Sequence, residues 1–185
     1  MIDFQEDDDY GYKNRTIKNA SADVTIALAA DFNTAGEKLT KNSVRNQNKL
    51  YIPVPLDVFQ SNDVVHNTFD DIAKAIISLD KNNISLNIAG NGIYTLKDTY
   101  MQNQKSVDYF VLVMLKEIIK RLDGKVSILL IRSGGQSGVD EAGIKAGVKL
   151  EIPTLVLSPK GWRYRNELSQ DIMNEELFKK RFETT

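Results

Sequence analysis

Short, mostly apolar runs separated by polar segments rich in glycine set the pattern of this chain. Such runs span residues 24–30, 51–54, 85–89, 128–131 and 154–157. Successive apolar residues predict strands that are buried on both faces, as in a parallel sheet covered by helices.

Longer segments with apolar residues at helical spacing lie between these runs. Residues 68–79 follow Asn67 as a candidate N-cap, and residues 106–122 carry a long apolar stripe that ends at Gly124. A third segment, 139–150, leads directly into the last apolar run. This alternation predicts the α/β class: a single Rossmann-like domain with a mostly parallel sheet, right-handed crossovers and helices on both faces.

The first twenty residues lack this pattern. Residues 1–20 are polar and acidic, with three successive aspartates at 7–9, and predict a solvated acidic arm ahead of a domain at 21–185. The alternative is a segment that docks on a surface or partner through its aromatic residues, Phe4, Tyr10 and Tyr12.

Loops rich in glycine follow several of the predicted strands. The carboxyl ends of parallel strands lie at one edge of a sheet, where α/β folds bind ligands, and glycine allows a backbone to approach a phosphate closely. The alternative for any single loop is a plain turn whose glycines relieve crowding. The candidate ligand-binding residues in these loops are Gly90, Asn91 and Gly92, followed by Ser133, Gly134, Gly135, Gln136, Ser137 and Gly138. The loop 31–36 ends at the same predicted edge.

Charged and aromatic residues beside these loops are further candidates for ligand contacts. Arg132 is suited to clamp a phosphate, or else to form an ion pair at the sheet edge. Tyr94 offers a surface for stacking a base. A cationic and aromatic loop follows the last strand, where Trp162 either stacks on a base or closes the edge of the core. Its candidate residues are Lys160, Gly161, Trp162 and Arg163.

Three motifs resemble a known family. They are S-G-G-Q-S-G-V-D-E-A at 133–142, E-I-P-T at 151–154 and P-K-G-W at 159–162. Together they are similar to the molybdenum-cofactor carrier family, within the SLOG superfamily of Rossmann-like nucleotide-binding domains. The resemblance covers residues 84–165. It implies nucleotide or phosphate binding, and pairing of copies into a homodimer or larger homo-oligomer in which a neighbour's loop completes the pocket.

The same superfamily includes the cytokinin-activating phosphoribohydrolases called Lonely Guy, whose motif is P-G-G-x-G-T-x-x-E. The loop of this chain has one more residue between its second and third glycines, Val139 replaces the threonine, and no proline precedes the glycine pair. Glu141 nevertheless lies at the motif glutamate's distance from Gly135. The comparison therefore bears differently on the two activities: it favours phosphate binding more than hydrolysis.

Composition narrows the chemistry. The chain has 185 residues, no cysteine, one histidine and a net charge of −1. These counts exclude disulfides, thiolate catalysis and a histidine-rich metal site, and give no general reason to bind a nucleic acid polymer. A cytoplasmic protein without a membrane span is the expectation.

Three functions follow from the sequence. The first is a carrier, sensor or sequestering protein that binds a nucleotide-like phosphate compound as its small-molecule partner. The second is a hydrolase of an N-glycosidic bond, in which Glu141 or Asp140 activates water and Arg132 stabilises negative charge. The third is a non-catalytic interaction scaffold. The alternative for Asp140 and Glu141 is that they only complement the dipole of the helix that they begin, with no further role. No metal ligand set is assigned, and Mg²⁺ would require Asp31 to lie beside these acids.

Overall fold

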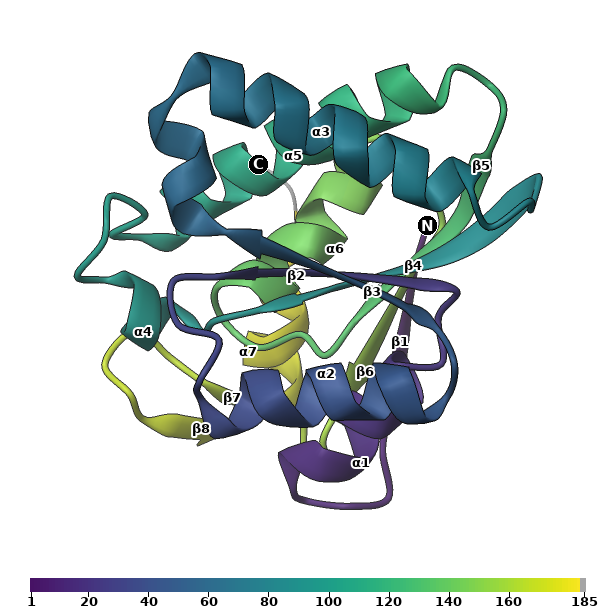
Figure 1. The fold of residues 1–185 in the computed structure, drawn as a ribbon. Coiled ribbons are helices and arrows are strands. Elements are labelled where there is room, and N and C mark those ends of the chain that lie inside the picture. Colours follow the sequence, from purple (N-terminus) through teal and green to yellow (C-terminus); the bar gives the residue numbers. More distant parts are fainter. Residues whose placement is uncertain (184–185) are drawn as a thin grey trace.

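A parallel sheet of six strands forms the centre of the protein (Figure 1). The computed structural model describes residues 1–183, apart from the side chains of Gln60 and Asn62. The strand order is β1-β6-β5-β4-β2-β3, and every neighbouring pair is parallel. The strands are β1 (Ile2–Glu6), β2 (Val24–Ala29), β3 (Leu50–Pro55), β4 (Asn83–Gly90), β5 (Ser127–Ser133) and β6 (Thr154–Ser158). The predicted Rossmann-like α/β fold is therefore confirmed.

Helices cover both faces of this sheet, with α3, α5 and α6 on one face and α1 and α2 on the other (Figure 1). A short antiparallel hairpin of β7 (Arg163–Arg165) and β8 (Asp171–Met173) follows β6. The helices are α1 (Tyr12–Asn19), α2 (Ala35–Asn46), α3 (Asn62–Ile77), α4 (Ile93–Leu96), α5 (Gln104–Leu122), α6 (Val139–Lys149) and α7 (Glu175–Lys180), with a 3-10 turn at Leu56–Gln60.

The order of the strands creates a switch point between β2 and β4. The chain leaves β2 through α2 to pair β3 on one side, whereas it leaves β4 to pair β5 on the other side. The two connections diverge at the carboxyl ends of these strands and open a crevice there, which is where doubly wound folds bind ligands.

The N-terminal residues differ from the predicted solvated arm. Ile2–Glu6 pairs in parallel with Thr154–Ser158 as the edge strand β1, and the next segment folds as α1. Phe4 packs against Phe182 with ring centroids 5.8 Å apart, so alternate residues of β1 face a hydrophobic cluster. Asp7 is buried and pairs with Lys18 at 3.1 Å. These contacts make residues 1–20 part of the domain.

The two faces of the sheet differ in polarity. The face under α3, α5 and α6 holds the main hydrophobic core, including Ile26, Leu86 and Ile88. On the opposite face, under α1 and α2, Tyr51, Thr25 and Asn87 stand in register across three strands.

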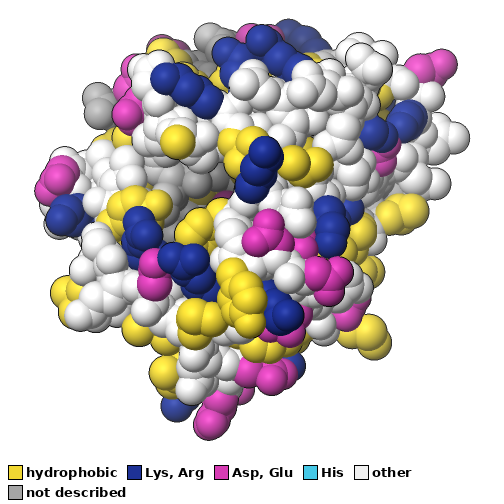
Figure 2. All heavy atoms as spheres, turned by 90° about the horizontal axis from the view of Figure 1, so that it is seen from below, with side chains coloured by type: hydrophobic (Ala, Val, Ile, Leu, Met, Phe, Trp, Pro, Cys, Tyr) yellow, Lys and Arg dark blue, Asp and Glu magenta, His cyan; other side chains and the backbone are white. Residues whose placement is uncertain are grey.

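We call this second region the polar layer, because α1 and α2 add further buried polar side chains to it. It comprises Thr25, Tyr51 and Asn87 of the sheet together with Arg15, Asn19, Glu37 and Thr40 of the helices. The outer surface over α1 and α2 carries basic and acidic side chains interspersed with hydrophobic ones (Figure 2). The chain thus places buried polar groups between a sheet and two helices, where hydrophobic packing is the usual solution.

Candidate functional site

A cavity of about 470 Å³ opens at the switch point, within the polar layer. Its walls come from α1, the first turns of α2, the carboxyl end of β4, the glycine loop before α6, and β7. Among the predicted site residues, those that line it are Gly90, Asn91, Gly92, Gly134, Gln136 and Asp140. Tyr94, residues 34–36 of the loop predicted at the same edge, and Arg165 of β7 also line it. The lining residues that the sequence did not indicate as ligand contacts include Tyr12, Arg15, Asn19, Glu37 and Asn87.

Asn91 holds the two loops of the switch point together. Its Oδ1 accepts hydrogen bonds from the backbone N–H groups of Ala30 and Asp31 at 2.9 and 3.0 Å, and its Nδ2 donates to the carbonyl of Asp31 at 3.1 Å. Gly90 lies so close to β2 that an added Cβ would overlap the carbonyl of Leu28. The predicted loop 90–92 therefore shapes the cavity mainly through packing and hydrogen bonds to the backbone.

The glycine loop meets a buried ion pair at Gly134. Arg15 Nη1 lies 3.0 Å from Asp140 Oδ2, and the two side chains are only 8% and 10% exposed. A Cβ on Gly134 would overlap the Arg15 guanidinium, so the absence of a side chain there is what admits Arg15. Burial raises the pKa of Asp140, and the Arg15 charge acts in the opposite direction. Arg15 comes from α1, in the segment predicted to be a solvated arm.

The first turn of α2 forms another wall. Thr34 is the N-cap, and its Oγ1 accepts a hydrogen bond from the Glu37 N–H at 3.3 Å. The amides of Ala35 and Gly36 belong to this turn and have no acceptor within the helix. They lie at the positive end of the helix dipole, which favours an anion.

Glu37, in the same turn, is the most unusual side chain of the cavity. It is 4% exposed. Burial raises its pKa to about 8, and the carboxylates of Asp140 and Asp31 act in the same direction. Its Oε2 has no hydrogen-bond partner among the residues described by the structure. At neutral pH Glu37 therefore holds its proton.

Other buried polar atoms of this region also lack partners. Within residues 1–183, they are Arg15 Nε, Asn19 Nδ2 and Tyr51 Oη, in addition to Glu37 Oε2. An unpaired buried polar atom costs about 1–3 kcal/mol, and several in one region are uncommon. These unpaired atoms include both donors and acceptors of hydrogen bonds, which suits a ligand that carries both kinds of polar group.

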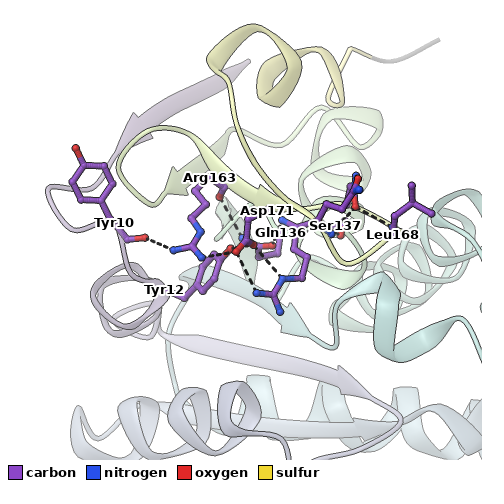
Figure 3. Close-up of polar contacts among 10 residues, drawn as sticks. Tyr10, Tyr12, Gln136, Ser137, Arg163, Leu168 and Asp171 are labelled. Carbon is purple, nitrogen blue, oxygen red and sulfur yellow. Dashed lines mark hydrogen bonds and ion pairs between the residues drawn. The ribbon is translucent and has the colours of Figure 1, made fainter.

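Tyr12 and Arg163 meet Asp171 where α1 approaches the β7–β8 hairpin, beside the cavity (Figure 3). Asp171 of β8 accepts hydrogen bonds from Tyr12 Oη at 3.1 Å and from Arg165 Nε at 3.1 Å, and it also pairs with Arg163. Hydrogen bonds from Arg165 and Arg163 lower the pKa of Asp171 to about 2. Arg165 also lies 5.5 Å from the ring centroid of Tyr94. Tyr12, Tyr94 and Arg165 thus all line the cavity, and a guanidinium group lies over each phenol ring.

Glu141 lies outside the cavity lining and has a structural environment. Its side chain is 5% exposed and pairs with Arg181 at 2.7 Å and with Lys145 at 2.6 Å. Arg181 also donates to the carbonyl of Gly135 at 2.7 Å and stacks on Tyr164, with its Cζ 3.8 Å from the ring centroid. Glu141 therefore attaches α7 to the glycine loop, and of the two predicted acids only Asp140 faces the cavity.

Arg132 also points elsewhere. It donates to Asn19 Oδ1 and Ser21 Oγ, both at 3.1 Å, and does not line the cavity. It thus supports α1 from the sheet rather than facing the glycine loop.

The remaining loop candidates mainly hold neighbouring segments in place. Ser133 Oγ donates to the carbonyl of Ile88 at 2.7 Å, and Ser137 Oγ donates to the carbonyl of Arg165. Gln136 lines the cavity and accepts from the Arg165 N–H at 2.9 Å. Gly138 has a φ of 99° and accepts and donates hydrogen bonds with Gln104.

The loop 160–163 lies outside the cavity lining. Trp162 packs on Phe178 with ring centroids 5.5 Å apart, which corresponds to the alternative in which it closes the edge of the core. Lys160 Nζ lies 5.2 Å from the ring centroid of Tyr10, and Gly161 N–H donates to Glu6. Arg163 binds Asp171, as described above.

Two further expectations concern metals and membranes. Within residues 1–183, no group of three or more His, Asp or Glu side chains is arranged to hold a metal ion, and Asp31, Asp140 and Glu141 do not meet in such a group. None of the described helices combines the length and apolar character needed to cross a bilayer.

The buried state of Glu37 leads to a prediction about stability. Its pKa rises from the ordinary value of 4.5 to about 8 on folding, so the folded protein retains a proton that the unfolded chain releases. The Glu37 carboxyl therefore costs no stability below pH 4.5, and its cost grows as the pH rises toward 8. We expect Glu37→Gln to stabilise the protein by about 3 kcal/mol at pH 8, a rise in Tm of about 6–12 °C, and far less at pH 5. Thermal unfolding followed by circular dichroism at both pH values measures this difference, and an equal gain at both would contradict it.

Comparisons with known proteins add no identification. The chain matches no family model, and neither a curated protein nor a solved structure is significantly similar to it. The motifs at 133–142, 151–154 and 159–162 lie at the glycine loop, at the start of β6 and before β7. Their resemblance to SLOG proteins therefore stays a prediction from the sequence.

Proposed function

We propose that the protein binds a nucleotide-like small molecule that carries phosphate, and acts as a carrier, sensor or sequestering protein. The observation that carries this proposal is the cavity of about 470 Å³ at the switch point, whose lining combines the first turn of α2, the Arg15 guanidinium and the phenol rings of Tyr12 and Tyr94. A volume of this size suits a ligand of nucleotide dimensions.

The lining of the cavity suits both parts of such a ligand. The phosphate fits near the first-turn amides of α2 and the Arg15 guanidinium, where the helix dipole and a cation attract an anion. The base fits against the side chains around Tyr12 and Tyr94, whose rings lie under guanidinium groups, because bases stack both on phenol rings and on guanidinium planes. Mixed charge over the α1 and α2 face supports a small ligand over a nucleic acid polymer (Figure 2).

Hydrolysis of an N-glycosidic bond is the second candidate. Two carboxyl groups from different elements, Asp140 and Glu37, line one cavity, and burial raises the pKa of both. Environments that shift carboxyl groups in this way are typical of acid and base catalysts. Asp140 replaces Glu141 as the favoured catalytic acid, because Glu141 is engaged by Arg181 and Lys145.

Ligand-observed proton NMR with AMP, a cyclic dinucleotide, NAD and ADP-ribose tests both candidates. We expect saturation transfer to at least one of these compounds, with every signal intact over hours for a carrier or sensor. Loss of the anomeric signal with release of free base would establish the hydrolase instead. Absence of transfer to all four would contradict nucleotide binding.

A matched pair of variants tests where the phosphate lies. Gly36 lines the cavity, and a Cβ added there meets no atom within 4 Å, so Gly36→Asp and Gly36→Asn both fit the fold. Asp also suits the first turn of a helix, but its charge repels a bound phosphate. We expect Gly36→Asp to weaken AMP binding about tenfold or more relative to Gly36→Asn, as measured by titration calorimetry. Equal affinities would move the phosphate away from α2.

A further inference from the structure

The buried carboxyl of Glu37 has no part in the ligand binding proposed above. This carboxyl is buried in the cavity wall, in the same helical turn as the candidate phosphate site, and Oε2 is unpartnered among the described residues. Within residues 1–183, no lysine or arginine forms an ion pair with it. A cation would have been the usual partner of a buried glutamate.

The groups that face Glu37 come from four elements. Asp140 approaches from α6 and Asp31 from the loop after β2, and both disfavour a charged Glu37. Tyr51 of β3 is also close, and burial raises its pKa to about 12, with the Glu37 charge acting in the same direction, so it stays neutral. Arg15 of α1 lies in the same cavity but is paired with Asp140. The surroundings therefore favour a neutral carboxyl that donates one hydrogen bond and accepts others.

We propose that Glu37 is a ligand-contacting residue whose protonated carboxyl hydrogen-bonds a sugar hydroxyl of the bound nucleotide, so that binding is coupled to the proton on Glu37. This inference rests on the proposed function. A hydroxyl both donates and accepts, as a neutral carboxyl does. Glu37 lines the same cavity as the tyrosines and shares the first turn of α2 with the candidate phosphate site, and in a nucleotide the sugar connects the base to the phosphate.

Loss of the proton changes this interaction in two ways. An ionised Glu37 can no longer donate, and its charge lies beside a phosphate and two aspartates. The anionic ligand therefore binds the protonated protein better, and its affinity falls as the pH rises through about 8. If only the protonated form binds, about a tenth of the protein is competent at pH 9, and the apparent Kd of AMP rises about tenfold from pH 7. AMP itself stays a dianion over most of this range, because its second pKa is about 6.

Two substitutions distinguish the effect of the Glu37 proton from the effect of the hydrogen bond between Glu37 and the ligand. Glu37→Gln has the shape of the neutral carboxyl and both donates and accepts at every pH. Glu37→Ala removes the contact altogether. Asp71→Asn serves as a control, because it neutralises an exposed carboxylate of α3, on the opposite face of the sheet from Glu37.

The experiment is titration calorimetry of AMP and of 2′,3′-dideoxy-AMP at pH 7 and pH 9. We expect the natural protein and Asp71→Asn to bind AMP about tenfold more weakly at pH 9 than at pH 7, whereas Glu37→Gln keeps one affinity. The natural protein and Glu37→Gln should prefer AMP over the dideoxy compound, and Glu37→Ala should not distinguish them.

The outcomes separate this inference from the proposed function. AMP binding with the same pH dependence in Glu37→Gln as in the natural protein would overturn the role of Glu37 alone. Equal discrimination between the two nucleotides by Glu37→Ala and the natural protein would do the same. Failure of the natural protein to bind AMP at either pH counts against the proposed function itself.

Discussion

Replacement of Arg181 by methionine is expected to lower the free energy of unfolding by about 3 kcal/mol, since loss of one partner of a buried ion pair leaves the other charge uncompensated. Arg181 binds Glu141 and the carbonyl of Gly135, and it stacks on Tyr164. Methionine keeps much of the apolar stem, so the change removes mainly the charge and its hydrogen bonds. Lys145 remains beside Glu141, which limits the loss. Urea unfolding followed by circular dichroism measures it.

The double variant Arg181→Met with Glu141→Gln is the control. It removes both charges, so part of the lost stability should return if the buried pair is the cause. A double variant that loses the sum of the two single effects would instead mean that Arg181 acts through its packing on aromatic rings. The same experiment tests the structural assignment of Glu141, because a catalytic acid would not be rescued in this way.

Gly134→Ala is expected to reduce stability by about 2–3 kcal/mol at pH 7 and to abolish measurable AMP binding. The new Cβ would overlap the Arg15 guanidinium, and a flexible arginine yields before the backbone does. Arg15 then leaves Asp140 buried without its partner. Burial raises the pKa of Asp140, so the cost should shrink as the pH falls toward the ordinary value of 3.8, where the carboxyl takes up a proton. Thermal unfolding at pH 7 and pH 4.5 and calorimetry with AMP measure both effects.

Gly36→Ala is the matched control for stability. Gly36 lies in the first turn of α2, and its added Cβ meets nothing within 4 Å, so the same chemical change should be neutral or slightly stabilising. If Gly134→Ala behaved like Gly36→Ala, Arg15 would have an alternative position that keeps its contact with Asp140. That result would mean that a glycine at position 134 is not required to place Arg15 beside Asp140.

The sequence predicts the strands and helices that carry their own periodic signal. The runs in β2, β4, β5 and β6, and the long helices α5 and α6, are recognisable because burial on both sides of the sheet demands them. The strand β1 gives a weaker signal, with two apolar residues in five, and depends on the free edge of β6. Helix α3 begins at Asn62, before the predicted Asn67 cap, since tertiary packing extends it.

The candidate site is predictable only in part for the same reason. Gly134 and Asp140 lie in one local motif, so a sequence pattern can indicate them. Arg15 meets Asp140 across 125 positions of the chain, and no local rule relates the two. In the sequence, Glu37 is an ordinary acidic residue of the first turn of a helix. Its burial depends on the packing of α1 over α2, which the neighbouring residues do not indicate.

The pairing of β1 with β6 also has a consequence for biosynthesis. During translation Ile2–Glu6 leaves the ribosome long before its partner Thr154–Ser158, which lies far along the chain. Such long-range parallel pairing forms late and slowly. Because α1 directly follows β1, Arg15 reaches its place over Gly134 only at that stage. The binding site and the pairing of β1 with β6 should therefore arise together, and a nascent chain that lacks Thr154–Ser158 should hold no ligand.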